Sequence, residues 1–180
     1  MAREKVEFRN KDGNTLSAVI EHPQGDPKGF ALFAHCFTCT KNLSAVRRIS
    51  QGLTDQGIGV LSFDFTGLGE SEGEFATSGF AHQTDDLVSA ADFLKKHIGK
   101  GPELLIGHSL GGTATLYAAR RIPSVLGVST IGSPADPAHV TKLFECDVEE
   151  IEQRGEADVS IGGRPFTISK SFVDDLKAHP

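Results

Sequence analysis

A serine lies between two closely spaced glycines in the segment Gly107-His108-Ser109-Leu110-Gly111. This G-x-S-x-G pattern is typical of a tight strand-to-helix turn that exposes a nucleophilic serine, because a side chain at either glycine would collide with the neighbouring strand or helix. The first N–H groups of the following helix point toward the same place. The pattern predicts acyl hydrolysis with Ser109 as the nucleophile. The alternative is a glycine-rich turn whose serine only caps a helix.

A nucleophilic serine also needs N–H donors for the negative charge that develops on the carbonyl oxygen. The amide of Leu110 is one such donor by its position in the motif. The second donor should come from a loop after an earlier strand, and residues 35–42 follow the apolar run 30–34. We expect the Phe37 amide to be that second donor. We interpret His35 as a buried histidine that hydrogen-bonds this loop, in preference to a proton-transfer residue.

The base and the acid are harder to place. Only two histidines, His139 and His179, follow Ser109 in the chain. Asp136 stands three residues before His139 and is best interpreted as the N-cap of a helix, with Pro137 at the first helical position. A surrogate pair in which Asp136 orients His139 stays open as an alternative.

Cysteines give the sequence a rival chemistry. Cys36 and Cys39 form a C-x-x-C motif, which could be a redox pair with a lowered thiol pKa. The sequence holds no second C-x-x-C, which excludes a four-cysteine zinc site within one chain, and we predict no metal. We expect Cys36 and Cys39 to be free thiols. Cys146 makes the cysteine count odd, which favours a reducing, cytoplasmic setting.

Strand and helix patterns alternate along most of the chain. Extended apolar runs occupy 30–34, 60–63, 104–106 and 125–131, and helical spacing occupies 46–53, 87–98 and 113–120. This alternation predicts an α/β fold with a mostly parallel sheet and helices on both faces. Two further extended runs, 6–8 and 16–20, flank an Asp-Gly pair. They predict an antiparallel hairpin at one edge of the sheet.

The pattern changes after Gly132. We expect a helix over 139–153, a hairpin around Gly162-Gly163 and a final helix over 172–177. The chain is therefore predicted to have two parts. Residues 1–132 are expected to form the α/β core, and residues 133–180 are expected to form a cap-like helix-hairpin-helix segment.

Four stretches, in this order along the chain, resemble the α/β-hydrolase superfamily. They are HCF at 35–37, DFTGLGES at 64–71, GHSLGG at 107–112 and SPADPAHV at 133–140. They are most similar to the N-terminal hydrolase part of bifunctional α/β-hydrolase/OsmC-like proteins. The resemblance implies carboxylesterase-like hydrolysis of an ester or related acyl substrate, with no metal or organic cofactor. It implies a structural role for Asp64, as a residue that holds its loop by hydrogen bonds.

The same resemblance implies that the acid and histidine of the catalytic triad lie beyond Pro180, in a parent chain that also carries an OsmC-like domain. We therefore expect this chain to be a weak or inactive hydrolase. A sheet that stops before its last strands would expose an unpaired edge, which favours a homodimer through that edge.

Charge and composition limit the partners. The chain has 24 acidic and 18 basic residues, a net charge of −6 and no stripe of lysines and arginines. This balance argues against nucleic acid or an anionic membrane as the main partner and leaves a small-molecule ester or acyl substrate. The N-terminus lacks the apolar region of a secretory signal. Two other functions stay open: thiol redox or peroxide chemistry at Cys36 and Cys39, and a pseudo-hydrolase that binds without turnover.

Overall fold

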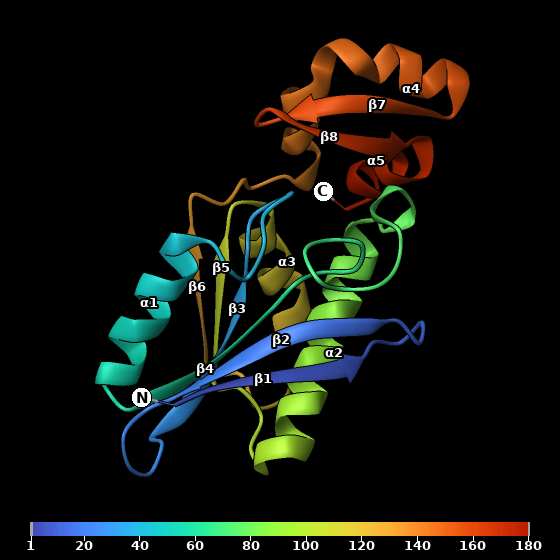
Figure 1. The fold of residues 1–180 in the computed structure, drawn as a ribbon. Coiled ribbons are helices and arrows are strands. Elements are labelled where there is room, and N and C mark those ends of the chain that lie inside the picture. Colours follow the sequence, from blue (N-terminus) through green and yellow to red (C-terminus); the bar gives the residue numbers. More distant parts are fainter. Residues whose placement is uncertain (1, 180) are drawn as a thin grey trace.

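The computed structural model describes residues 2–179 (Figure 1). The elements of the sheet region are β1 (Ala2–Arg9), β2 (Thr15–His22), β3 (Gly29–Ala34), α1 (Ser44–Asp55), β4 (Ile58–Phe63), the short 3-10 turn η1 (Phe75–Thr77), α2 (Phe80–Ile98), β5 (Leu104–His108), α3 (Leu110–Ala119) and β6 (Gly127–Ile131). The strand order is β1-β2-β4-β3-β5-β6. Strands β4, β3, β5 and β6 are parallel, and the β1–β2 hairpin adds an antiparallel edge. The predicted fold class is therefore confirmed.

Helices cover both faces of the sheet, and the central strand β3 shows why. Side chains alternate between the two faces along a strand. Ala31 and Phe33 belong to a cluster with Val46 of α1. Phe30 and Leu32 belong to a larger cluster with residues of α2 and α3. In Figure 1, α1 lies on one side of the sheet, and α2 and α3 lie on the other. A strand buried on both faces must be apolar throughout, as the 30–34 run is.

The chain after β6 lies over the carboxyl ends of the parallel strands (Figure 1). It contains the 3-10 helix η2 (Pro137–Asp147), α4 (Val148–Arg154), the antiparallel pair β7 (Glu156–Ile161) and β8 (Arg164–Ser169), and α5 (Lys170–Lys177). The predicted hairpin and final helix are confirmed. The predicted continuous helix over 139–153 is wrong, because Phe144 leaves helical geometry with φ −141° and only 3% of its surface is exposed. Burial of this ring outweighs the helical periodicity of the segment.

This last segment packs against the core through aromatic rings. The ring of Phe172 in α5 lies 5.5 Å from Phe37 and 5.9 Å from Phe75, measured between centroids. The Asp175 carboxylate accepts a hydrogen bond of 2.8 Å from the Ala81 amide at the start of α2. These contacts hold residues 164–177 beside the loop that follows β3.

Candidate active site

Ser109 occupies the single residue between β5 and α3. Its backbone has φ 54° and ψ −131°, a region that residues other than glycine rarely adopt. The Ser109 N–H donates to the Ile131 carbonyl at 2.9 Å, and the Ser109 carbonyl accepts from the Gly112 N–H at 2.9 Å. The conformation is therefore held by the neighbouring strand and by the helix. In α/β sheets, ligands bind outside the carboxyl ends of the strands, where this turn lies.

The glycines of the motif are required by space. A Cβ atom on Gly107 would lie 2.3 Å from the Gly112 Cα, and one on Gly111 would lie 2.2 Å from the His35 carbonyl oxygen. The start of α3 thus packs directly against the loop after β3. The Ser109 side chain makes no capping hydrogen bond to α3, so the alternative of a merely capping serine is wrong.

The loop after β3, residues 35–42, packs against the start of α3 and contains a tight turn. The Cys39 N–H donates to the Cys36 carbonyl at 3.0 Å, with Phe37 and Thr38 between them. Across residues 2–179, no carbonyl or side chain accepts a hydrogen bond from the backbone N–H of Phe37 or of Leu110. Both amides are therefore available to a ligand, as a pair of donors for an anionic oxygen would have to be.

His35 is buried and holds this loop by hydrogen bonds. Its Nδ1 atom lies 2.9 Å from the Cys36 carbonyl oxygen, so Nδ1 carries the proton. Its Nε2 atom accepts from the Phe65 N–H at 3.4 Å. Burial lowers the pKa of His35 from 6.5 to about 4, although its bond to the Cys36 carbonyl and the nearby Asp64 carboxylate oppose the shift. A neutral imidazole that binds the Cys36 carbonyl also orients the peptide unit that carries the Phe37 N–H.

This buried histidine makes stability depend on pH. The unfolded chain takes up a proton near pH 6.5, whereas folded His35 takes it up only near pH 4. The folded state therefore loses stability as the pH falls from 6.5 toward 4, and the full contribution is present above pH 6.5. We predict that His35→Asn flattens this slope in urea unfolding curves. His82→Asn, at a half-exposed position, is the control, and an equal flattening in both variants would refute the assignment.

Asp64 lies behind the same loop and has no exposed surface. Its carboxylate accepts from the Lys41 N–H at 2.6 Å, from Lys41 Nζ at 2.6 Å and from the Glu70 N–H at 3.0 Å. Lys41 Nζ also donates to the Glu70 carboxylate at 2.8 Å. Asp64 therefore ties the 35–42 loop to residues 64–70, in agreement with the structural role expected for it.

The expectation that Cys36 and Cys39 are free thiols is wrong, because a disulfide joins them. The turn between the two residues brings their Cα atoms to 5.2 Å, well within the range over which cysteines can be bridged. The C-x-x-C spacing alone could not distinguish free thiols from a disulfide. Cys146, in η2, is free and exposed.

A pocket of about 390 Å³ opens beside Ser109. His139 lines it as well, but His139 is exposed and makes no hydrogen bond to Ser109 within the part of the chain that the structure describes. Asp136 Oδ1 accepts from the Ala138 N–H at 2.8 Å, with Pro137 next, which is the N-cap arrangement expected for it. The structure thus brings His139 to the site and keeps the Asp136 carboxylate at the start of η2.

Ser133 is a residue of this pocket that the sequence analysis missed. Its hydroxyl is buried and has no hydrogen-bond partner within the described residues. The sequence did contain a signal, because Ser133 opens the SPADPAHV stretch and follows Gly132, the first residue after β6. His179, the other histidine after Ser109, bonds the Asp175 carbonyl at 2.8 Å and packs on the rings of Phe80 and Tyr117.

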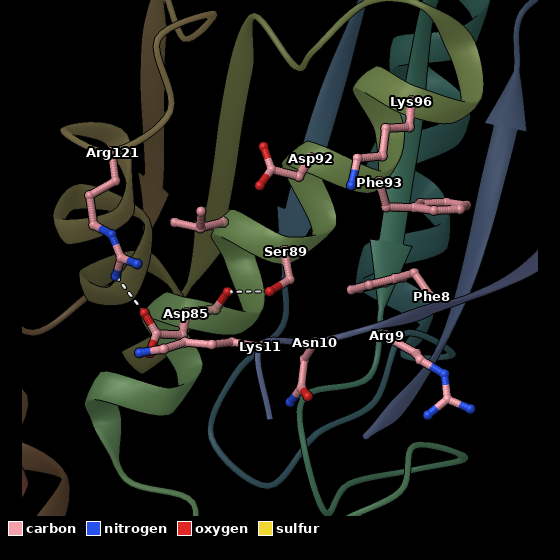
Figure 2. A pocket seen from close by; sticks show the side chains of 11 residues that line it. Phe8, Arg9, Asn10, Lys11, Asp85, Ser89, Asp92, Phe93, Lys96 and Arg121 are labelled. Atoms are coloured by element: carbon pink, nitrogen blue, oxygen red, sulfur yellow. Dashed lines mark hydrogen bonds and ion pairs between the residues drawn. The ribbon is translucent and has the colours of Figure 1, made fainter. Parts of the chain in front are cut away.

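A second pocket, of about 480 Å³, lies between the end of β1 and α2 (Figure 2). Three of its charged side chains form a paired group. Asp85 forms ion pairs with Arg121 at 2.6 Å and with Lys11 at 3.2 Å. Figure 2 shows Arg121 and Lys11 converging on this carboxylate. None of the sequence-predicted site residues lines this pocket, so the pocket beside Ser109 is the better candidate for chemistry.

The strand order, with a serine in a strained turn after β5, defines an α/β-hydrolase. Comparison with protein families agrees, since residues 25–143 match the Hydrolase_4 family, described as serine aminopeptidase, S33. The chain belongs to this family of the α/β-hydrolase superfamily. The family is one of hydrolytic enzymes.

Three similar proteins show the range of the family. Palmitoyl-protein thioesterase ABHD10, mitochondrial, of Rattus norvegicus is 36% identical over 130 residues, which are 68% of this chain and 42% of that protein. Monoglyceride lipase of Rattus norvegicus is 29% identical over 74% of this chain and 45% of its own length. The crystal structure of the esterase domain from a Rhodothermus marinus protein is 47% identical, with a TM-score of 0.73, over 99% of this chain and 69% of that one. The chain spans less than half of the curated relatives' length.

Proposed function

We propose that this chain carries the nucleophile and the oxyanion donors of a serine esterase, which hydrolyses an ester or related acyl compound through an acyl-Ser109 intermediate. The proposal rests on the strained backbone of Ser109, together with two amides, of Phe37 and Leu110, that have no acceptor within residues 2–179. Strain of this kind persists where the surrounding structure enforces it, and it clusters at active sites.

The proposed reaction has two steps. Ser109 Oγ attacks the carbonyl carbon, and the amides of Phe37 and Leu110 bind the oxygen as it becomes negative. Collapse of the tetrahedral intermediate expels the alcohol or thiol and leaves the acyl group on Ser109. Water then attacks the acyl-enzyme in the same way and releases the acid. Each attack needs a base to take a proton, and no residue among 2–179 is assigned that role, because His139, which lines the pocket, makes no hydrogen bond to Ser109.

The walls of the pocket indicate the substrate class. Pro134, Val140 and Leu143 give it an apolar side, next to the buried Ser133 hydroxyl. An apolar wall beside a nucleophile suits the hydrocarbon part of an acyl group. The names of the thioesterase, lipase and esterase relatives support the same ester and thioester chemistry. In this proposal residues 133–180 are the cap over the site, and residues 1–132 are the hydrolase core.

Labelling with an organophosphate probe tests the proposal. Because no base is hydrogen-bonded to Ser109 within the described residues, we expect p-nitrophenyl phosphonate in large excess to form a covalent adduct on Ser109 slowly, and mass spectrometry of the peptide that contains Ser109 detects it. Ser109→Ala should abolish the adduct, and Ser133→Ala should keep it, because Ser133 only lines the pocket. An adduct that persists in Ser109→Ala would contradict the proposal. Binding of a short ester without any adduct would favour a pseudo-hydrolase.

Three proposals about partners and location accompany this function. The four ordered motifs support an OsmC-like domain in the parent chain. A cytoplasmic location stays a proposal, and there the Cys36–Cys39 disulfide would exchange with reducing thiols. No helix among residues 2–179 is long and apolar enough to cross a bilayer.

Within the described part of the chain, β6 has a strand neighbour on one side only, and Leu126 beside it is 87% exposed. Self-association through β6 follows from such an edge, and sedimentation at several protein concentrations tests it.

A further inference from the structure

The disulfide encloses one half of the proposed oxyanion site. Cys36 and Cys39 are bonded across a turn whose central residues are Phe37 and Thr38. Phe37 supplies the amide that the proposed mechanism uses. The Phe37 N–H belongs to the first peptide unit of this turn, whose carbonyl also binds His35 Nδ1, so a rearrangement of the turn acts on the direction of that N–H.

Stabilisation of the whole fold is a poor explanation for this disulfide. A disulfide that closes a very short loop removes the least conformational entropy from the unfolded chain, so it adds little to global stability. Both cysteines are only half-buried, so a small thiol can approach them. The bond is thus placed to act on the local turn rather than on the whole fold.

The turn needs a constraint, because Thr38 has φ 63°. This left-handed region favours glycine at the third position of a turn and is costly for a β-branched residue. Three interactions oppose relaxation of Thr38: the disulfide, the bond from the Cys39 N–H to the Cys36 carbonyl, and a hydrogen bond from Arg164 of β8 to the Thr38 carbonyl. The disulfide is the only covalent one of the three.

We propose that the Cys36–Cys39 disulfide is a reducible lock on the oxyanion amide. In the oxidised state it holds Thr38 in its strained conformation and keeps the Phe37 N–H turned toward the Ser109 site. In the reduced state Thr38 relaxes to negative φ, and the Phe37 N–H no longer points toward the Ser109 site. The inference rests on the proposed function for its effect on hydrolysis, but not for the structural change itself.

The reductant is a dithiol, and the exchange balances. One thiolate of the dithiol attacks a sulfur of the disulfide, the S–S bond breaks, and a mixed disulfide and one cysteine thiolate form. The second thiol of the reductant then attacks the mixed disulfide. The reductant leaves as its own disulfide, and Cys36 and Cys39 gain two electrons and two protons as free thiols. An oxidised dithiol drives the same steps in reverse.

The structural part is tested on the chain with Cys146→Ser, which removes the remaining free thiol. The isolated protein is alkylated with iodoacetamide before and after reduction with dithiothreitol. Mass spectrometry then measures the mass of the peptide that contains Cys36 and Cys39. We expect no alkylation before reduction and two alkylated cysteines after it. In ¹⁵N–¹H spectra, the amide peaks of Phe37 and Thr38 should move on reduction. Free thiols in the isolated protein, or an unmoved Phe37 peak, would overturn the inference.

Thr38→Gly is the matched variant. Glycine adopts positive φ without strain, so the turn should persist when the disulfide is reduced. We expect the Phe37 amide peak of Thr38→Gly to stay near its oxidised position after dithiothreitol. An equal movement in both proteins would overturn the role of Thr38.

The functional part is read from the rate at which p-nitrophenyl phosphonate labels Ser109. Reduction should slow labelling by about 100-fold, the loss expected for one oxyanion donor, and Thr38→Gly should lose much less. Equal rates in both redox states would overturn control of the site by the disulfide. If Ser109 is labelled in neither state, the proposed function fails, and the amide spectra still decide whether the lock exists.

Discussion

Replacing Asp64 with alanine is expected to lower the free energy of unfolding by about 3–5 kcal/mol, the usual cost of breaking a buried ion pair by removing one partner. Lys41 is only 3% exposed, and its ammonium group would keep a single carboxylate partner, Glu70. The backbone N–H groups of Lys41 and Glu70 would also lose their acceptor. Removing the carboxylate therefore leaves the buried Lys41 ammonium with one partner fewer and leaves two backbone amides without their acceptor.

The matched control is Glu70→Gln. The Glu70 side chain contacts the same Lys41 ammonium, but it is 61% exposed, so its charge is screened by water. Urea unfolding followed by circular dichroism should show a much smaller loss for this variant. Asp64→Asn keeps the shape of the side chain and one acceptor oxygen, so its loss of free energy of unfolding should lie between those of Asp64→Ala and Glu70→Gln. It also provides a folded variant if Asp64→Ala does not fold. Equal losses for Asp64→Ala and Glu70→Gln would contradict a buried structural role for Asp64.

Local patterns predicted the elements that surround the site. The uniformly apolar 30–34 run could only be a strand buried on both faces, as β3 is. The Gly-Gly pair at 162–163 set the β7–β8 turn. The spacing of glycines around Ser109 predicted a turn too tight for side chains, and the structure places Gly111 against the His35 carbonyl. These features depend on neighbours in the sequence or on the steric size of one residue.

The features that the sequence did not reveal depend on three-dimensional geometry that no spacing pattern encodes. Arg164 reaches the Thr38 carbonyl across 126 positions, and no periodicity encodes such a pair. The break in η2 depends on where the Phe144 ring finds space in the core. The disulfide depends on the geometry of one turn, and C-x-x-C spacing is compatible with both thiols and disulfides. Tertiary packing decided the first two features, and the geometry of a local turn decided the third.

The chain by itself is expected to turn over p-nitrophenyl acetate only slightly faster than water does. The chain contains the proposed nucleophile Ser109 and both proposed oxyanion donors, but no base is hydrogen-bonded to Ser109 within the described residues. A serine hydroxyl without an adjacent base is a weak nucleophile at neutral pH. Because triad members act as a unit, lack of the base alone costs on the order of 10⁴–10⁶ in turnover, and the oxyanion donors leave a small remainder.

The decisive comparison uses this chain, Ser109→Ala and His139→Ala in the same ester assay. We expect the weak rate of the unaltered chain to fall further in Ser109→Ala, because the remaining catalysis needs the hydroxyl. It should change little in His139→Ala, because His139 is exposed and makes no hydrogen bond to Ser109 within residues 2–179. Rapid turnover that is lost in both variants would show instead that His139 moves onto Ser109 and acts as its base. Asp136, whose carboxylate caps η2 three residues earlier, would then be the acid to test next.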